Sequence, residues 1–206
     1  MKQNTLKKTG KRRGERGFTL IEVMIAIVVM SIGILAVIAS FATAVAATQS
    51  AEEDLIARQK VLEAMESIYT ARNSQQIPFS AVANVSNGGI FLDGAQTLRC
   101  AGPDGLVNTA DDVNCTTQAG ATCPDGGAEC MVLPGDDGIL GTADDKVMSL
   151  GNFTRTITMS PVFYPTGPNA GSVNPNMMGI SITVSYTKAG IPKRSFTANG
   201  LISSYH

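Results

Sequence analysis

The hydrophobic and polar positions of this 206-residue chain form three successive patterns, and the first is a long uncharged run. Residues 23–47 carry no charged side chain and are rich in Ile, Val, Met and Ala. At a rise of 1.5 Å per residue, about 20 such residues cross the hydrocarbon core of a bilayer. The pattern therefore predicts a membrane-spanning helix over residues 18–47.

The second pattern is an apolar stripe with helical spacing, which predicts that the helix continues over residues 48–72. Neither Gly nor Pro interrupts residues 52–72, and Leu55, Leu62 and Tyr69 recur every seven residues. We expect this stripe to pack against a globular head formed by residues 73–206. Val61, Met65 and Ile68 belong to the same stripe, and Glu53, Lys60, Glu63, Glu66 and Ser67 are expected on the opposite side.

The third pattern is alternation of apolar and polar residues near the C-terminus. It covers residues 153–159, 180–186 and 196–202, and it predicts half-buried strands of an antiparallel sheet. Residues 188–193 fit a hairpin connection, whereas residues 161–176, with four prolines, are expected to form a surface loop. The predicted fold class is therefore α+β, with a long N-terminal helix packed on a small antiparallel sheet.

A basic leader precedes the uncharged run. Residues 1–17 contain seven Lys and Arg against one acid, Glu15. An ordinary secretory signal has its apolar segment before the cleavage site, but here that segment follows Gly17 and would remain after cleavage. The leader cations favour a cytoplasmic N-terminus with the later residues exported.

Glu22 is a carboxylate near the start of the predicted membrane helix. Such a group costs about 2.5–3.5 kcal/mol at the bilayer centre, and less near an end, so it calls for a partner. Phe18 lies four residues earlier, on the same face of a helix that starts there. Cleavage after Gly17 would create an amine at Phe18 that could pair with Glu22 of the same or a neighbouring chain. The alternative is an interfacial carboxylate in an ordinary single-pass anchor.

The run Arg-Gly-Phe-Thr-Leu-Ile-Glu-Val at residues 16–23, followed by a long apolar helix, resembles the N-terminus of type IV prepilins and of type II secretion pseudopilins. The resemblance covers residues 14 to about 70. It implies a type IV pilin fold, cleavage after Gly17 by a prepilin peptidase, N-methylation of Phe18, and a filament in which Glu22 pairs with the N-terminus of an adjacent subunit. The implied partners are the membrane, other pilin subunits, the peptidase and methylase, and the inner-membrane assembly machinery.

One departure from this family refines the expectation. Major pilins usually carry a proline some twenty residues into the mature helix, where this chain has Ile38-Ala39-Ser40. The chain is therefore more similar to PilV-type minor pilins and GspI-type pseudopilins. Either would begin as a bacterial inner-membrane precursor and end at the cell surface or in the periplasm.

The four cysteines lie close together on the predicted outer side of the membrane. An even number in an oxidising compartment favours two disulfides, for which three pairings are possible. The local pairing joins Cys100 to Cys115 and Cys123 to Cys130. A zinc site is disfavoured, because no Cys-x-x-Cys occurs and the sole histidine is His206.

Residues 99–146 form an Asp-, Gly- and Cys-rich insertion that contains an internal repeat. The first copy spans residues 102–112, and the second copy follows 33 residues later at 135–145. Glycine-bent loops with carboxylates can bind Ca²⁺, although the spacing does not match an EF-hand, and a pair of β-turns is the alternative. The candidate calcium ligands are Asp104, Asp111, Asp112, Asp137, Asp144 and Asp145.

No residue pattern predicts an enzyme, since a terminal histidine does not suit a Ser-His-Asp or Cys-His site. Without the leader, nine Lys and Arg face 16 Asp and Glu, a net charge of about −7 that disfavours nucleic-acid binding. Three functions are compatible with the sequence. They are a minor pilin of a type IV pilus, a type II secretion pseudopilin, and a membrane-anchored calcium-dependent binding module or adhesin.

Overall fold

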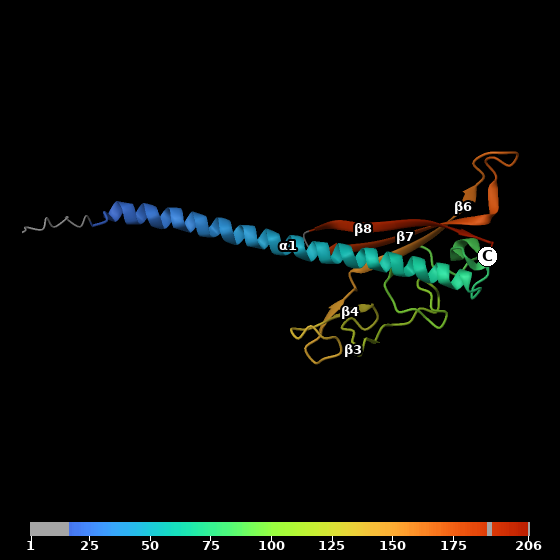
Figure 1. The fold of residues 1–206 in the computed structure, drawn as a ribbon, viewed down its shortest axis with the longest axis horizontal. Helices are drawn as coiled ribbons and strands as arrows, with labels where there is room; N and C mark the ends of the chain where they lie inside the picture. The colour runs from blue at the N-terminus through green and yellow to red at the C-terminus, as the bar shows by residue number, and fades with distance from the viewer. Residues whose placement is uncertain (1–16, 189–190, 206) are drawn as a thin grey trace, which may run out of the picture. The chain divides into compact units, whose positions relative to one another are not determined.

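The computed structural model describes residues 17–188 and 191–205 (Figure 1). Residues 1–16 of the predicted leader, part of the predicted hairpin connection at 188–193, and His206 lie outside the described residues. The elements in chain order are α1 (Leu20–Asn73), η1 (Phe79–Ala81), η2 (Val85–Asn87), β1 (Gln96–Thr97), β2 (Thr117–Gln118), β3 (Ala121–Thr122), β4 (Cys130–Leu133), β5 (Lys146–Ser149), β6 (Phe153–Phe163), β7 (Val173–Lys188) and β8 (Ile191–Ser203).

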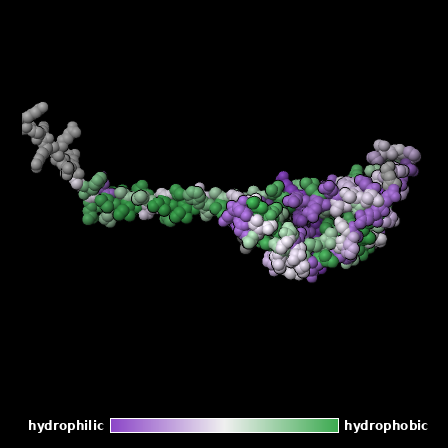
Figure 2. Space-filling model, turned by 60° about the horizontal axis from the view of Figure 1, so that its bottom comes forward, coloured by the Kyte–Doolittle hydropathy of each residue, from purple (hydrophilic) through white to green (hydrophobic). Residues whose placement is uncertain are grey.

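Contacts divide the chain into two units between Gln49 and Ser50. The first unit contains the uncharged part of α1, whose surface is almost continuously hydrophobic (green in Figure 2). Within the described part of the chain, α1 is the helix long and apolar enough to cross a membrane. Ser31 and Thr43 in this stretch donate their hydroxyls to helix carbonyls at 2.7 and 2.8 Å, so these groups are compatible with lipid.

The second unit is the head, and its main sheet has the strand order β1-β6-β7-β8 with antiparallel pairing throughout. The register places Ile182 of β7 between Ile157 of β6 and Ala198 of β8, so alternate residues of all three strands share a face. The α+β fold and the three alternating strands predicted from the sequence are thus confirmed. The fold is consistent with that of type IV pilins.

The predicted surface loop over residues 161–176 is shorter than expected. β6 continues to Phe163 and β7 starts at Val173, which leaves residues 164–172 as the connection. The register shifts between Pro161 and Phe163. β1 pairs with β6 at Thr154 and Arg155, so Pro161 lies on an edge of the sheet, where the missing N–H and the register shift do not end the strand.

The head part of α1 packs along β8, and the two run in the same direction (Figure 1). Asp54 pairs with Arg194 at 2.8 Å, and eighteen residues further along α1, Arg72 donates to the carbonyl of Ser204 at 2.7 Å. Between these points the Tyr69 hydroxyl donates to the Leu201 carbonyl at 3.1 Å.

The buried face of this helix differs from the predicted stripe. Leu55 and Leu62 are 66% and 59% exposed, whereas Lys60, expected toward solvent, is only 7% exposed. Val61, Met65 and Ile68 are buried as predicted. The prediction was wrong for Leu55, Leu62 and Lys60, because small residues decide which face approaches the sheet: Ala57 and Ala64 flank Lys60 one turn away on either side, and both are buried. The buried residues of α1 are Ile56, Ala57, Lys60, Val61, Ala64, Met65, Ile68, Ala71 and Arg72.

Side-chain amides from loops cover part of the edge of β6 that β1 leaves unpaired. Asn84 donates to the carbonyl of Ile157 at 2.8 Å and accepts from the N–H of Met159 at 2.7 Å. Asn108 donates to the carbonyl of Arg155 at 3.0 Å. Both amides are buried, so they satisfy backbone groups that would otherwise lack partners away from water.

The insertion between β1 and β6 is held by two short hairpins and two disulfides. β2 pairs with β3, and β4 pairs with β5. The structure joins Cys100 to Cys115 and Cys123 to Cys130, which is the local pairing among the three possible ones. Cys115, Cys123 and Cys130 form a small buried cluster of their own, with Cys100 packed against it, so the disulfides substitute for an apolar core here.

Candidate assembly site and the duplicated head loops

The predicted cleavage site lies in non-helical backbone. Gly17 and Phe18 precede α1, which begins at Leu20, and the Phe18 side chain is 81% exposed. A peptidase binds its substrate in an extended form, so cutting the bond between Gly17 and Phe18 requires no helix to unwind. Both predicted processing residues therefore lie outside α1, and cleavage between them stays a prediction.

Thr19 caps the N-terminus of α1. Its hydroxyl accepts a hydrogen bond from the N–H of Glu22 at 3.3 Å, and its carbonyl accepts from Val23 at 3.2 Å. Thr-x-x-Glu is the sequence signature of such a cap. The signature is present in the sequence and marks this start, whereas the predicted helix began at Phe18. Phe18 and Glu22 consequently do not share a helical face as expected.

Glu22 lies in the first turn of α1, where a carboxylate interacts favourably with the positive end of the helix dipole. The side chain is exposed in the single chain. An exposed carboxylate at the end of an apolar helix is accessible to a cation from outside the helix. The geometry therefore allows pairing with an amine of another subunit.

The two copies of the Asp-Gly repeat, from here on loop 1 (102–112) and loop 2 (135–145), fold alike. Asp104 in loop 1 and Asp137 in loop 2 each accept a hydrogen bond from the N–H two residues later, at 2.8 Å in both. The intervening glycines have φ of +68° and +72°, which an L side chain rarely adopts. Each aspartate therefore closes the same tight bend.

A Thr hydroxyl fixes the next carboxylate of each loop. Thr109 donates to Asp111, and Thr142 donates to Asp144, at 2.7 Å in both loops. These hydrogen bonds favour the charged form, and they hold the pKa of both carboxyls below the ordinary value of 3.8. The same carboxylates also accept from the backbone N–H of the aspartate at the bend, at 3.4 and 3.2 Å.

The last aspartate of each loop accepts from a residue in left-handed conformation. Asp112 accepts from the N–H of Asn108 at 2.8 Å, and Asp145 accepts from that of Gly141 at 2.7 Å. The φ angles of the donors are +61° and +91°. The Asp112 carboxyl is half-buried, and burial raises its pKa despite these hydrogen bonds.

The candidate calcium ligands are thus brought together within each loop, but as acceptors for the loop itself. Within the described ranges, no three His, Cys, Asp or Glu side chains converge closely enough to hold a metal ion. A calcium site here would have to combine one or two carboxylates with backbone carbonyls, which Ca²⁺ accepts as ligands. Calcium binding by these loops stays a prediction.

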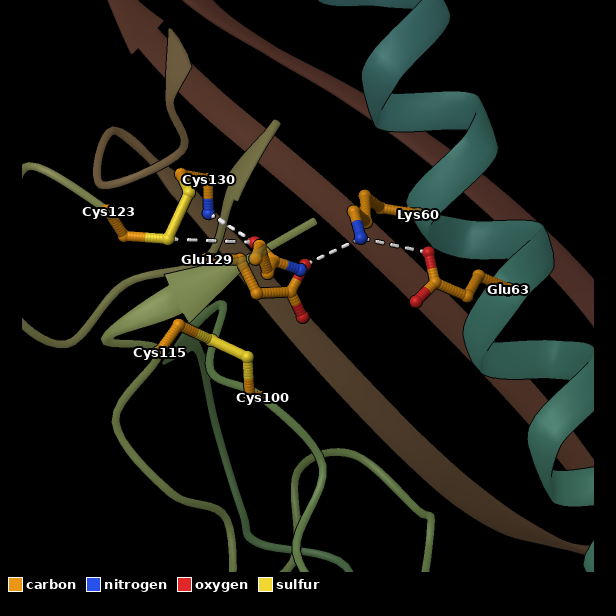
Figure 3. The surroundings of a disulfide bond; sticks show 8 residues. Lys60, Glu63, Cys100, Cys115, Cys123, Glu129 and Cys130 are labelled. Atoms are coloured by element: carbon orange, nitrogen blue, oxygen red, sulfur yellow. Dashed lines mark hydrogen bonds and ion pairs between the residues drawn. A yellow bond between two sulfur atoms is a disulfide. The ribbon is translucent and has the colours of Figure 1, made fainter. Parts of the chain in front are cut away.

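A buried ionic cluster that was not predicted from the sequence connects α1 to the disulfide insertion (Figure 3). Lys60 lies 2.6 Å from Glu129 and 2.9 Å from Glu63. Burial opposes the charged form of Lys60, but the carboxylates of Glu129 and Glu63 outweigh it and raise its pKa. Because Glu129 precedes Cys130, the pair ties the Cys123–Cys130 disulfide region to the helix.

Arg155 of β6 is, with Lys60 and Arg72, one of the buried cations of the head. It is fully buried, and its Nε donates to the side-chain oxygen of Asn108 at 2.8 Å. Burial lowers its pKa, while the nearby carboxylates of Glu129 and Asp112 favour the charged form. Arg155 therefore anchors loop 1 to the central sheet, and loop 2 has no equivalent contact among the described residues.

The N-terminal segment matches the family model of the prokaryotic N-terminal methylation motif over residues 12–38. This match supports a type IV pilin-like protein that is processed by a prepilin peptidase and anchored in the membrane as a precursor. It points to a structural protein and to no enzyme family. No curated protein and no solved structure is significantly similar to the chain.

Proposed function

We propose that this protein is a minor subunit of a type IV pilus, cleaved after Gly17 and assembled through α1 into the filament or its initiating complex. The observation that carries the proposal is the position of the motif: the processing bond lies in non-helical backbone directly before a capped helix whose residues 23–47 are uncharged. An anchor that only held the head in the membrane would not need a cleavable leader on the cytoplasmic side of that helix.

Assembly consists in moving α1 from lipid into a bundle of similar helices. Apolar side chains are compatible with both environments, so they favour transfer without specifying the register. Glu22 supplies the register, because its charge is costly in an apolar bundle unless an amine lies beside it. The N-terminal amine created at Phe18 of an adjacent subunit is the partner we propose.

The test is a Glu22→Ala substitution expressed in the native cells. We expect the variant to be cleaved and membrane-inserted like the wild type, which intact mass would show as a chain that starts at Phe18. We also expect at least a tenfold loss from the sheared filament fraction. Glu52→Ala, in the exposed head part of the same helix, is the control and should be incorporated normally.

The alternatives give different results in the same experiment. Efficient incorporation of Glu22→Ala would refute the register role. A wild-type chain that is cleaved but found only in short periplasmic assemblies would favour a type II secretion pseudopilin. A wild-type chain that keeps its leader in cells with an active peptidase would favour the anchored binding module.

Calcium is the metal we propose for loop 1 and loop 2. The support is the repetition of three aspartates at equal spacing in two similar glycine-bent loops, because such loops can supply both carboxylates and backbone carbonyls to Ca²⁺. The proposed role is to stiffen an insertion that has little apolar core of its own. Pilus assembly through α1 does not depend on this role.

A further inference from the structure

Loop 1 and loop 2 each carry two adjacent aliphatic residues directly after the bend. They are Leu106 and Val107 in loop 1, and Ile139 and Leu140 in loop 2. The aspartate bend before the pair and the Thr-to-Asp hydrogen bond after it recur in both loops, so each pair follows the same type of turn. The Thr hydroxyls differ in their second acceptor, which is Asp112 in loop 1 and the Ile139 carbonyl in loop 2. What differs is the environment that receives the pair.

In loop 1 the aliphatic pair fills a socket in the head of its own chain. Leu106 is fully buried and Val107 is 6% exposed, and both belong to the main apolar core. Polar contacts surround this insertion. The side-chain amide of Gln76, just after α1, donates to the Asp104 carbonyl at 2.7 Å. The backbone N–H of Leu92 donates to the Asn108 carbonyl at 2.7 Å. Loop 1 thus shows how this loop type docks.

In loop 2 the aliphatic pair is exposed to solvent. Ile139 is 61% and Leu140 is 58% exposed. The loop around them is nevertheless fixed by the bonds to Asp137, Asp144 and Asp145. A preorganised loop loses little conformational entropy when it binds, and two adjacent exposed aliphatic side chains at its tip favour burial against a partner.

We propose that loop 2 inserts Ile139 and Leu140 into an apolar socket, bordered by basic side chains, on a neighbouring pilin-like subunit. Loop 1 provides the precedent for the basic border, because Asp112 lies in the field of the buried Arg155, and Asp145 is its counterpart in loop 2. In this chain the corresponding socket is filled by loop 1 itself, so the partner is a different subunit. The inference rests on the proposed function in that it takes the partner from the same filament.

A lipid surface is the other environment that exposed aliphatic residues could enter. Loop 2 carries Asp136 and Asp137 before the aliphatic pair and Asp144 and Asp145 after it, with Lys146 paired to Asp136 at 3.2 Å. This excess of negative charge disfavours approach to an anionic bilayer surface. The charge of the loop therefore favours a protein socket with basic side chains.

The test places the photo-crosslinking residue p-benzoylphenylalanine at Leu140 of the full chain in its native cells. The same residue at Asn169, in the exposed connection between β6 and β7, is the control. After irradiation, we expect an adduct from position 140 alone that contains a second subunit with a prepilin-type N-terminus. An adduct with lipid only, with a second copy of this chain only, or with the same partners from both positions would overturn the proposal.

A pair of double variants supplies the quantitative test. The double variant Ile139→Ser with Leu140→Ser removes the aliphatic pair. We expect the amount of the crosslinked subunit that co-purifies with the chain to fall at least tenfold. Ile139→Leu with Leu140→Ile keeps the apolar volume and should retain the partner. Both should unfold at the wild-type temperature, since neither residue belongs to the core. Wild-type retention by the serine variant would overturn the proposal.

The same experiment distinguishes a failure of loop 2 to dock from a failure of the proposed minor-pilin function. Crosslinking and isolation are read in the membrane fraction as well as in sheared filaments. If the wild type is absent from filaments, the minor-pilin function fails, while the adduct in the membrane still reports whether loop 2 docks. If the wild type is in filaments and position 140 gives no specific adduct, only the docking inference fails.

Discussion

Loop 1 and loop 2 have the same conformation and opposite surroundings. Their aspartate bends, their left-handed donors and the hydrogen bonds from Thr109 to Asp111 and from Thr142 to Asp144 correspond, yet the aliphatic pair is in the core in one loop and in solvent in the other. Local side-chain hydrogen bonds therefore determine the shape of such a loop. Whether the loop serves the fold or remains available to a partner is determined by what lies next to it.

The largest effect should come from truncating the aliphatic pair. Leu106→Ala leaves a cavity in the core, so we expect it to lower the free energy of unfolding by about 2–5 kcal/mol. Ile139→Ala, the matched variant in loop 2, should change it by less than about 0.5 kcal/mol. Urea denaturation of the detergent-solubilised chain, followed by tyrosine fluorescence, measures both. Equal losses would show that loop 2 is buried in the protein.

The glycine that opens each loop should give the next largest effect. A Cβ at Gly102 would collide with the backbone carbonyl and side chain of Asp111, and one at Gly135 would collide with those of Asp144. We expect Gly102→Ala to cost about 1–3 kcal/mol of stability, because loop 1 is tied to the core. Gly135→Ala should distort loop 2 alone.

Hydrogen exchange of the loop amides distinguishes the two glycine variants. Faster exchange confined to residues 135–145 is expected for Gly135→Ala, whereas Gly102→Ala should also accelerate exchange in β6. Identical exchange patterns in the two variants would contradict the difference in surroundings.

Calcium should have a smaller effect than either substitution. If a loop binds Ca²⁺ with a dissociation constant near 10⁻⁴ M, 1 mM calcium adds about 1.4 kcal/mol for that site and raises the melting temperature by about 3–6 °C. The double variant Asp144→Asn with Asp145→Asn should reduce this increase. A melting temperature that is the same in calcium and in chelator would show that calcium binding does not stabilise either loop.

The smallest effect should be a change in carboxyl titration, and it should be equal in the two loops. Thr109→Val and Thr142→Val remove the hydroxyl that lowers the pKa of Asp111 and Asp144, so each pKa should rise toward 3.8. A carboxyl group with a lowered pKa stabilises the folded state at pH values above its ordinary pKa. This stabilisation is lost as the pH falls through the lowered pKa. NMR titration of the aspartate carboxyl carbons measures these shifts directly. A shift in only one loop would show that their hydrogen bonds differ.

Much of the fold could be predicted because the relevant signals are local. The uncharged run, the alternation along β6, β7 and β8, and the repeat of the Asp-Gly loops are properties of short segments. The signal for the cap at Thr19 is also local, because the Thr-x-x-Glu signature spans four residues, although the helix was predicted to start at Phe18.

The remaining features depend on distant parts of the chain. Helical spacing predicts that Lys60 faces solvent. Its burial could not be predicted, because its partner Glu129 is 69 residues away and nothing near either residue indicates the other. The burial of Leu106 depends in the same way on contacts with α1 and β6. A repeat in the sequence therefore predicted two equal loops, but not that one of them would be in the core.

The amides of Asn84 and Asn108 have a consequence for how heads can be crowded together. An open strand edge is a template that pairs with the strands of any neighbouring molecule, which leads to aggregation. On β6 these two side chains occupy backbone groups at Arg155, Ile157 and Met159 that such a strand would need. Many heads can therefore be concentrated along one assembly without this edge joining them into a continuous intermolecular sheet.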